Sequence, residues 1–279
     1  DRGGQIQKAR KRRLSVARML GDRVVLPGEP LFGGEGVLRG HGTQVPPASR
    51  AAVDAPALLA TLAGRISRVN KLVSVQAPRR RFLAEVGDVV VGRVVEVQAS
   101  RWKVDVRGAN DATLALSSVQ LPGGQQRIRT HEDQLRMREL YEEGDLISAE
   151  VQAVKSDGTV HLHTHSLRYG KLQDGVVLAV PPPLVKRLKQ HTLRLPMGAQ
   201  VVLGVNGYIW ITGDGEEDVE LARIRNAIRA LARGFHSITP DAIMAVYEKS
   251  IEKGIEVHEM LGPDFPRQAA AFVEEGKTV

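Results

Sequence analysis

Residues 88–98 read DVVVGRVVEVQ, and this run of valines is typical of a long β-strand. Gly92 lies inside the run, where a glycine often marks a bend or a bulge. Two more segments with strand character follow, RWKVDV at 101–106 and ATLALSS at 112–118. This part of the chain is therefore predicted to begin with three consecutive strands.

A helix and two further strands are predicted downstream of these three. The helical insertion covers residues 131–145, with Thr130 as its N-cap and Asp133 placed three residues later. Strands are predicted at 146–154 and 159–167, and the KSDG sequence between them indicates a hairpin turn. Five strands with a helix between the third and the fourth is the order of an OB fold.

The whole chain is predicted to be a multi-domain, mainly β protein. Short apolar runs broken by glycine and proline predict an N-terminal β domain over residues 23–84. The OB barrel is assigned to residues 85–168, and an α/β domain with C-terminal helices to residues 169–279. Residues 1–22 are predicted to be a basic, flexible arm.

Strands and helices are both predicted in the last of these regions. The strands are expected at 175–180, 199–204 and 208–212. The helices are expected at 184–191, 217–235 and 239–254. Pro183 suits the first turn of the first helix, and the second helix carries apolar residues on one face. Thr239, Pro240 and Gly254 mark the ends of the third.

Composition and charge limit the functions that the chain can perform. It has 279 residues, a hydrophobic content of 42% and no cysteine, which excludes disulfides, thiol catalysis and cysteine-bound zinc. No apolar run reaches the roughly 18 residues that a membrane span needs, and we expect an intracellular location. The net charge is +7, but residues 1–20 alone hold seven Lys and Arg against one Asp. Any RNA-binding surface on the remaining chain should therefore be local.

Residues 204–207, GVNG, admit two interpretations. A Gly-x-x-Gly could be the phosphate-gripping loop of a KH domain, which lies between two helices. Here AQVVL precedes the motif and YIWI follows it, and both have strand character. Asn-Gly between such segments is a strong hairpin signal, and a type I′ turn needs positive φ at both central residues. Gly204, Asn206 and Gly207 are therefore predicted to form a structural turn.

Eight strings of residues carry a family likeness, in order and nearly without gaps from Asp22 to Ile211. They are VLPGE (25–29), RGHGT (39–43), GRISRVNKLVSV (64–75), EVGDVVVGRVVEV (85–97), RWKVD (101–105), LSSVQLPGG (116–124), EGDLISAEVQAVKSDGTVHLHTHSLRYGKL (143–172) and LGVNGYIWI (203–211). Together they resemble the RNA exosome cap subunit called ribosomal RNA-processing protein 4. The likeness weakens to a pattern of helices after Ile211, and it does not cover the basic arm.

This resemblance implies an N-terminal β domain, an S1-type OB domain and a KH domain. It implies a protein that is not a nuclease, needs no cofactor, and caps a six-membered ring of RNase PH-like subunits. The expected partners are that ring, other cap subunits, an associated exonuclease and single-stranded RNA, whose 3′ ends would be guided into the pore. The N-terminal domain would mainly contact the ring, and the Gly-x-Asn-Gly would be structural. The nucleus, the nucleolus and also the cytoplasm are the expected locations.

Clusters of cationic side chains are the candidate RNA contacts. Arg101 and Lys103 share one face of a predicted strand, with Trp102 on the other, and Arg107 extends the strip. The alternative is a core tryptophan flanked by solvated charges. An OB fold that binds RNA tracks the phosphates over such a face. The remaining candidates are Arg79, Arg80 and Arg81 at a domain junction, Arg127 and Arg129 on a loop, and Lys186, Arg187 and Lys189.

Aromatic residues make up only 4% of the chain, so base stacking is largely unavailable. RNA binding should then be electrostatic, sensitive to salt and tolerant of sequence.

Catalytic and metal-binding interpretations are weaker. His161, His163 and His165 alternate along one predicted strand, but side chains roughly 6.5 Å apart let two of them, not three, reach one metal comfortably. The acidic DGEEDVE at 214–220 is sequential, whereas two-metal chemistry needs carboxylates from separate elements. The chain is predicted not to be an enzyme. The alternatives kept open are a stand-alone or ribosome-associated OB/KH protein and a phosphorolytic exonuclease, although no catalytic core precedes the two modules.

Overall fold

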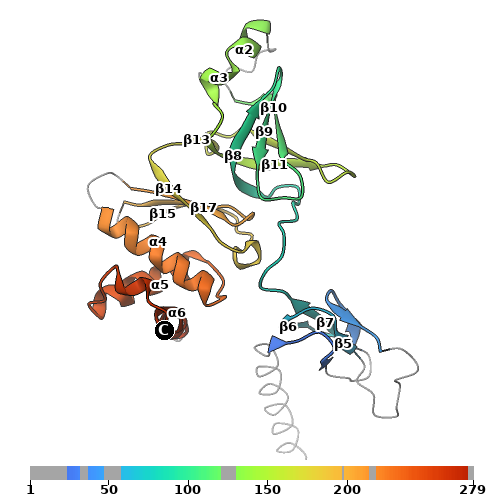
Figure 1. The fold of residues 1–279 in the computed structure, drawn as a ribbon, viewed down its shortest axis with the longest axis vertical. Helices are drawn as coiled ribbons and strands as arrows, with labels where there is room; N and C mark the ends of the chain where they lie inside the picture. Colours follow the sequence, from blue (N-terminus) through green and yellow to red (C-terminus); the bar gives the residue numbers. More distant parts are fainter. Residues whose placement is uncertain are drawn as a thin grey trace, which may run out of the picture. The chain divides into compact units, whose positions relative to one another are not determined.

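The computed structural model describes residues 24–31, 37–46, 58–120, 130–196, 198–213 and 218–275. The chain divides into two compact units, residues 1–78 and residues 79–279. Figure 1 shows that strands dominate except at the C-terminal end. The division falls before Arg79, earlier than the boundary expected after residue 84, because Phe82 packs into the core of the OB barrel.

The N-terminal unit is built from two small sheets. One has the order β1-β6-β7-β3 and the other β2-β5-β4. The strands of the first sheet are β1 (Val24–Val25), β3 (Leu38–Arg39), β6 (Gly64–Val69) and β7 (Leu72–Gln76). Those of the second are β2 (Pro30–Leu31), β4 (Thr43–Gln44) and β5 (Leu58–Ala60). A compact apolar core that includes Val25, Leu58 and Val75 holds them together.

The second unit begins with the barrel. Its strands are β8 (Val89–Val97), β9 (Arg101–Asp105), β10 (Ala112–Val119), β11 (Leu146–Val154), β12 (Val160–Thr164) and β13 (Gly170–Leu172). The order is β12-β10-β9-β8-β11-β13, and a further pairing of β12 with β11 closes the barrel. The predicted five strands are confirmed. The sixth, β13, was not predicted and extends the barrel sheet beyond residue 168.

The predicted helical insertion is formed as two short helices, α2 (His131–Leu135) and α3 (Met137–Leu140). The capping box of Thr130 and Asp133 is present. Trp102 on β9 is fully buried and donates its indole N–H to the carbonyl oxygen of Tyr141 over 3.0 Å. The insertion is therefore tied to the barrel core directly after α3.

Gly92 in β8 serves close packing. A Cβ at this position would collide with a methyl group of Val104 on β9. The irregularity in the β8–β9 ladder lies further along, between Val94 and Glu96. The glycine thus allows two strands to approach, and the expected bulge occurs beyond it.

The C-terminal part of the second unit is a four-stranded sheet of order β14-β17-β16-β15. Its strands are β14 (Gly175–Ala179), β15 (Thr192–Arg194), β16 (Gln200–Leu203) and β17 (Tyr208–Thr212). Three helices pack with this sheet: α4 (Asp218–Arg233), α5 (Pro240–Glu252) and α6 (Phe265–Glu275). Two 3-10 turns, η2 (Pro182–Leu184) and η3 (Glu259–Leu261), complete the domain.

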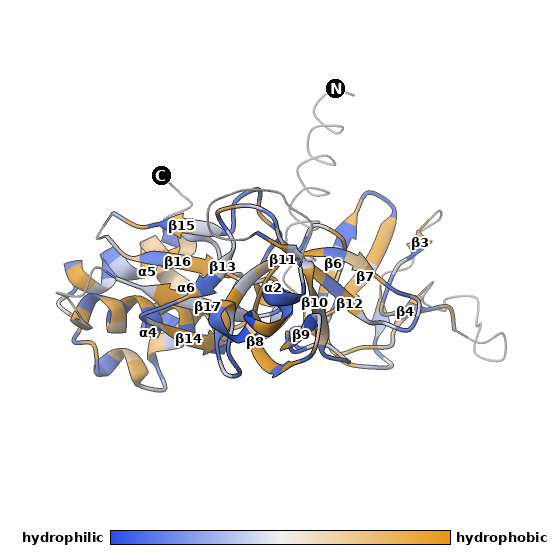
Figure 2. Ribbon diagram, turned by 90° about the horizontal axis from the view of Figure 1, so that it is seen from above, coloured by the Kyte–Doolittle hydropathy of each residue, from blue (hydrophilic) through white to orange (hydrophobic). Residues whose placement is uncertain are grey.

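Helix α4 is amphipathic, and Figure 2 shows both hydrophilic and hydrophobic segments along it. Its apolar residues Ile224, Ile228 and Leu231 are fully buried in the same core as Ile209 and Ile211 of β17. The predicted amphipathic helix is therefore confirmed, and its polar face remains in solvent.

The predicted helix at 184–191 is wrong. Only the turn η2 forms, after which Val185 is extended and bridges Ile238 in parallel. Leu184, the last residue of η2, and Val185, which is extended, are both buried, so the segment enters the domain core without forming an α-helix. In contrast, the third predicted helix is confirmed as α5, where the Thr239 hydroxyl accepts a hydrogen bond from the N–H of Ala242. Strand β15 and helix α6 were not predicted.

Candidate nucleic-acid interface

Residues 204–207 turn the chain between β16 and β17. The Gly204 N–H donates to the carbonyl of Tyr208, and the Gly207 N–H donates to that of Gly204, both over 2.9 Å. Among these residues only Gly207 has a positive φ, of 84°. The predicted two-residue type I′ turn is therefore wrong in type. The hairpin has a three-residue loop closed by a left-handed glycine, which is another common hairpin geometry.

This turn inserts into the barrel. Asn206 is fully buried, and its Nδ2 donates to the carbonyl oxygens of Val91 (2.7 Å) and Val106 (3.0 Å). Its Oδ1 accepts from the N–H of Val91 over 3.3 Å. The neighbouring Val205 donates its N–H to the carbonyl of Val89 over 2.9 Å. The Gly-x-Asn-Gly motif is thus used for contact between two domains, and its backbone faces protein.

Arg107 contributes to the same contact. Its backbone is left-handed, with φ of 58°, and its guanidinium donates to the carbonyls of Val180 (2.8 Å) and Gly207 (3.3 Å). The guanidinium also lies over the ring of Tyr208, 5.2 Å from its centroid. Burial, and next the neighbouring Asp105, raise the pKa of Tyr208. Arg107 was expected to extend an RNA-binding strip, and the structure uses it between the barrel and the α/β domain instead.

Arg187 forms a second bridge between these domains. Its guanidinium makes a bidentate pair with Asp88, at 2.6 and 3.1 Å, and an ion pair with Glu85 at 3.1 Å. The Asp88 side chain is almost fully buried, and its Oδ2 also accepts the N–H of Glu85 over 2.9 Å. The hydrogen bond to Asp88 raises the pKa of Arg187 further above its ordinary value. This predicted RNA contact is thus already paired with carboxylates.

A double-mutant cycle tests this bridge. We expect Arg187→Met to lower the free energy of unfolding by about 2–4 kcal/mol, because it leaves the buried Asp88 charge without its partner. Asp88→Asn in the Arg187→Met background should recover part of that loss, with a coupling energy of about 1–3 kcal/mol. Urea unfolding of the four proteins measures both quantities. Additive effects of the two substitutions would contradict the bridge.

Arg101 and Lys103 of β9 lie on the surface of the barrel. The burial of β9 alternates, with Trp102 and Val104 inside and Arg101 exposed. Lys103 forms a 2.6 Å ion pair with Glu96, and its hydrogen bond lowers the pKa of Glu96. Arg101 donates Nε to Gln98 over 2.6 Å. Both cations are therefore oriented by neighbours on β8 or in the β8–β9 turn while their positive ends stay at the surface.

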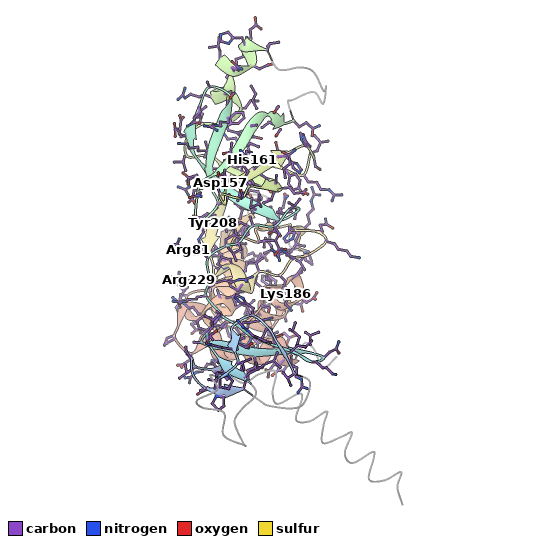
Figure 3. The ribbon with its side chains drawn as sticks, turned by 90° about the vertical axis from the view of Figure 1, so that its right-hand side faces the viewer. Arg81, Asp157, His161, Lys186, Tyr208 and Arg229 are labelled. Carbon is purple, nitrogen blue, oxygen red and sulfur yellow. The ribbon has the colours of Figure 1, made fainter. Side chains whose placement is uncertain are left out.

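The other predicted cations are spread over the second unit. Arg79 lies over the ring of Phe235, 5.7 Å from its centroid. Arg80, Arg81, Lys186 and Lys189 are exposed, and Figure 3 labels Arg81 and Lys186. Arg127 and Arg129 fall in 121–129, outside the described residues. Among the predicted cations that the structure describes, Arg107 and Arg187 lie at the domain contact, whereas Arg101, Lys186 and Lys189 are exposed.

The histidine row forms a surface cluster. His163 and His165 stack with centroids 4.9 Å apart, and His163 lies 3.9 Å from Glu150. Burial lowers the pKa of His163. Glu150 accepts the Tyr169 hydroxyl over 2.8 Å, and burial together with this contact raises the pKa of Tyr169 to about 12. Within the described ranges, no three His, Cys, Asp or Glu side chains converge as a metal site would require.

Sequence reasoning missed several residues of the interface and of the surface. Asp88, Asp105 and Tyr208 carry the contacts between domains, and their partners are roughly one hundred positions away in the chain. Arg225 and Arg229 are exposed on α4, and their spacing of four residues could have indicated a shared helix face. Among the described residues, no helix is long and apolar enough to cross a membrane.

The fold and the domain contact define a protein with an OB barrel followed by, and fastened to, a small α/β domain. A family model described as the S1 domain of RRP4 matches residues 81–153, and a KH domain model matches residues 175–217. The predicted fold class, an S1-type OB barrel and a KH domain after an N-terminal β domain, is therefore confirmed.

Relatives extend this similarity over most of the chain. Exosome complex component RRP4 of Bos taurus is 43% identical over 269 residues, covering 90% of this chain and 88% of that protein. The Saccharomyces cerevisiae protein of the same name is 45% identical over 197 residues, covering 71% of this chain and 53% of that one. A solved structure titled a putative exosome complex RNA-binding protein is 19% identical, covers 63% of this chain and 98% of its own, and has a TM-score of 0.45. From the sequence relatives, the chain belongs to the family of exosome complex component RRP4.

Proposed function

We propose that this protein is a non-catalytic cap subunit of an RNA exosome. It would stabilise a ring of RNase PH-like subunits and guide single-stranded RNA 3′ ends into the pore for processing and decay, including maturation of ribosomal RNA. The observation that carries the proposal is the similarity to RRP4 proteins over 90% of the chain. The proposed partners are the ring, the other cap subunits and an associated exonuclease, in the nucleus, the nucleolus and also the cytoplasm.

The contacts of the Gly-x-Asn-Gly turn support a positioning role. A cap subunit must hold its RNA-binding surfaces in a fixed relation, since guiding a strand depends on geometry. Asn206, Arg107 and Arg187 tie the KH domain to the S1 barrel through hydrogen bonds with backbone and carboxylate groups. The turn's backbone is occupied by these contacts, so RNA recognition through it is not part of the proposal.

RNA would be held by surface charge. Arg101 and Lys103 on the barrel are the best placed of the predicted contacts, because the outward face of an OB fold binds single strands. Lys186, Lys189 and the Arg79–Arg81 segment would add contacts to phosphates. Arg127 and Arg129 remain predicted contacts from the sequence. Such binding should weaken as salt rises, with little preference for sequence.

The absence of catalysis is part of the same proposal. S1 and KH modules supply binding surfaces, and the acidic stretch at 214–220 suits the start of a helix, where carboxylates interact favourably with the helix dipole. Asp218 is the first residue of α4. Hydrolysis or phosphorolysis would then come from the exonuclease that associates with the ring.

Purification of the tagged protein from its native cells tests the proposal. We expect RNase PH-like ring subunits to co-purify in near one-to-one ratio, as measured by mass spectrometry of the intact complex. RNA degradation by that complex should be lost when the associated nuclease is inactivated. Recovery with ribosomes, or alone, would contradict the cap role and favour the alternative of a stand-alone or ribosome-associated OB/KH protein.

A further inference from the structure

Four arginines lie on α4, and they divide into two kinds. Arg223 donates to the hydroxyl of Ser250 (3.1 Å) and to the carbonyl of Ile255 (2.7 Å), and Arg233 donates to the carbonyl of Leu261 (3.1 Å). These two fasten the helix to the segments that follow it. Arg225 and Arg229 are exposed, and neither forms a hydrogen bond or an ion pair with any described residue.

The placement of Arg225 and Arg229 is unfavourable for the helix alone. Residues four apart lie on the same face, and a like-charged pair there destabilises a helix. No Asp or Glu lies three or four residues from either arginine to offset the repulsion. A bound anion would offset this repulsion. The Arg225–Arg229 pair therefore indicates a surface that binds a negatively charged ligand.

The segment after the N-terminal unit brings more arginines to the same region. Arg79 lies on the ring of Phe235, which follows the C-terminal end of α4, and Arg80 and Arg81 come next and are exposed. Figure 1 shows this segment passing the end of α4. Figure 3 shows Arg81 and Arg229 at the same edge of the molecule. Cations from two separate parts of the chain therefore share one surface.

We propose that Arg225 and Arg229, together with Arg80 and Arg81, form a second binding site for the sugar-phosphate backbone of single-stranded RNA. We call it the α4 surface. It rests on the proposed function in taking RNA as the ligand, and it is distinct from the Arg101–Lys103 strip on the barrel. A helical spacing of four residues spans about 6 Å, which is similar to the separation of neighbouring phosphates in an extended strand. Guanidinium groups bind phosphate oxygens in bidentate fashion.

RNA fits this surface better than a protein partner does. Protein interfaces need a desolvated centre, usually built on aromatic or aliphatic anchors. The exposed aromatic ring that follows α4, Phe235, already lies against Arg79. What remains is positive charge presented to solvent, which matches the sequence-independent phosphate contacts of single-strand binding.

The test is fluorescence anisotropy of the full chain with a labelled 25-nucleotide oligouridine, titrated at several salt concentrations. We expect Arg225→Glu with Arg229→Glu to weaken binding about 10-fold at low salt. The same variant should reduce the salt slope by about 1.4, because two phosphates would no longer be neutralised. The matched control is Lys71→Glu with Arg194→Glu, which makes the same change in net charge at two other exposed positions. Arg225→Ala with Arg229→Ala should weaken binding in the same direction without disturbing the helix.

The possible results distinguish failure of the α4 surface from failure of the proposed cap function. Equal affinities for the α4 variant and its control, with weaker binding by Arg101→Glu with Lys103→Glu, would overturn the α4 surface and leave the proposed function standing. No RNA binding by the wild-type chain at low salt would overturn both RNA sites, while ring co-purification still reports separately on the cap role. Unchanged RNA affinity together with loss of one co-purifying protein from the α4 variant would assign the surface to a protein and overturn the RNA site.

Discussion

Asn206→Val should lower the free energy of unfolding of the S1–KH unit by about 3–5 kcal/mol, because each buried polar group left unpaired costs about 1–3 kcal/mol. The substitution leaves three such groups, the N–H and C=O of Val91 and the C=O of Val106. The β8–β9 ladder begins only at Arg93 and Asp105. The Asn206 amide thus continues the ladder where β9 has ended, and a valine of similar size offers no donor or acceptor.

Urea unfolding followed by circular dichroism measures this loss. Asn110→Val is the matched control, since Asn110 is exposed and makes one long hydrogen bond of 3.4 Å to the carbonyl of Asp157. We expect the control to change stability by less than about 0.5 kcal/mol. RNA affinity measured where the Asn206 variant is still folded should be near normal. A stable Asn206→Val protein that has lost RNA affinity would refute the structural role.

Much of the barrel could be predicted from sequence because its signals are local. Strands β9, β10 and β12 alternate between fully buried and more exposed residues, and β8 is a run of valines whose composition alone indicates a strand. Likewise, Asn-Gly between two apolar segments correctly predicts a hairpin. The type of turn could not be predicted, since the conformation of Asn206 depends on partners in the barrel that lie more than one hundred positions away.

The roles of the cations show the same limit. Arg101, Arg107 and Arg187 look alike in sequence, since each is a cation next to an apolar residue. Only the fold determines that Arg107 donates a hydrogen bond to the carbonyl of Val180 and that Arg187 donates one to Asp88. Arg101 donates a hydrogen bond to Gln98 on the same exposed surface. Charge alone therefore predicts too many RNA contacts, because a cation at a domain contact and one at a ligand surface have the same local pattern.

Strand β15 was missed and the segment at 184–191 was predicted incorrectly for a different reason. Strand β15 has three residues and pairs only with β16, so it is too short to show a period. The segment after Pro183 has helical spacing, yet Leu184 ends the turn η2 and Val185 is extended, and both pack in the core. Tertiary packing overrides local preference in such short segments.

Gly207→Ala is expected to destabilise the same unit by about 3 kcal/mol or more. A positive φ, here 84°, costs an alanine roughly 1–2 kcal/mol. The added Cβ would also collide with the carbonyl oxygen of Val180 and come within 3.2 Å of the Arg107 guanidinium. Backbone on one side cannot yield without moving the segment that Arg107 holds, so the cost exceeds that of the dihedral angle.

Gly144→Ala separates the two contributions. Gly144 has a φ of 99°, and a Cβ there would meet nothing within 4 Å. Its substitution should lower the free energy of unfolding by about 1–2 kcal/mol, because alanine disfavours a positive φ and no collision is added. The difference between the two variants, measured as midpoints of urea unfolding, then reports how closely the turn packs against the Val180 carbonyl and Arg107. Equal losses of stability in the two variants would mean that the turn can shift to accommodate a methyl group. That result would contradict close packing of the turn between the S1 and KH domains.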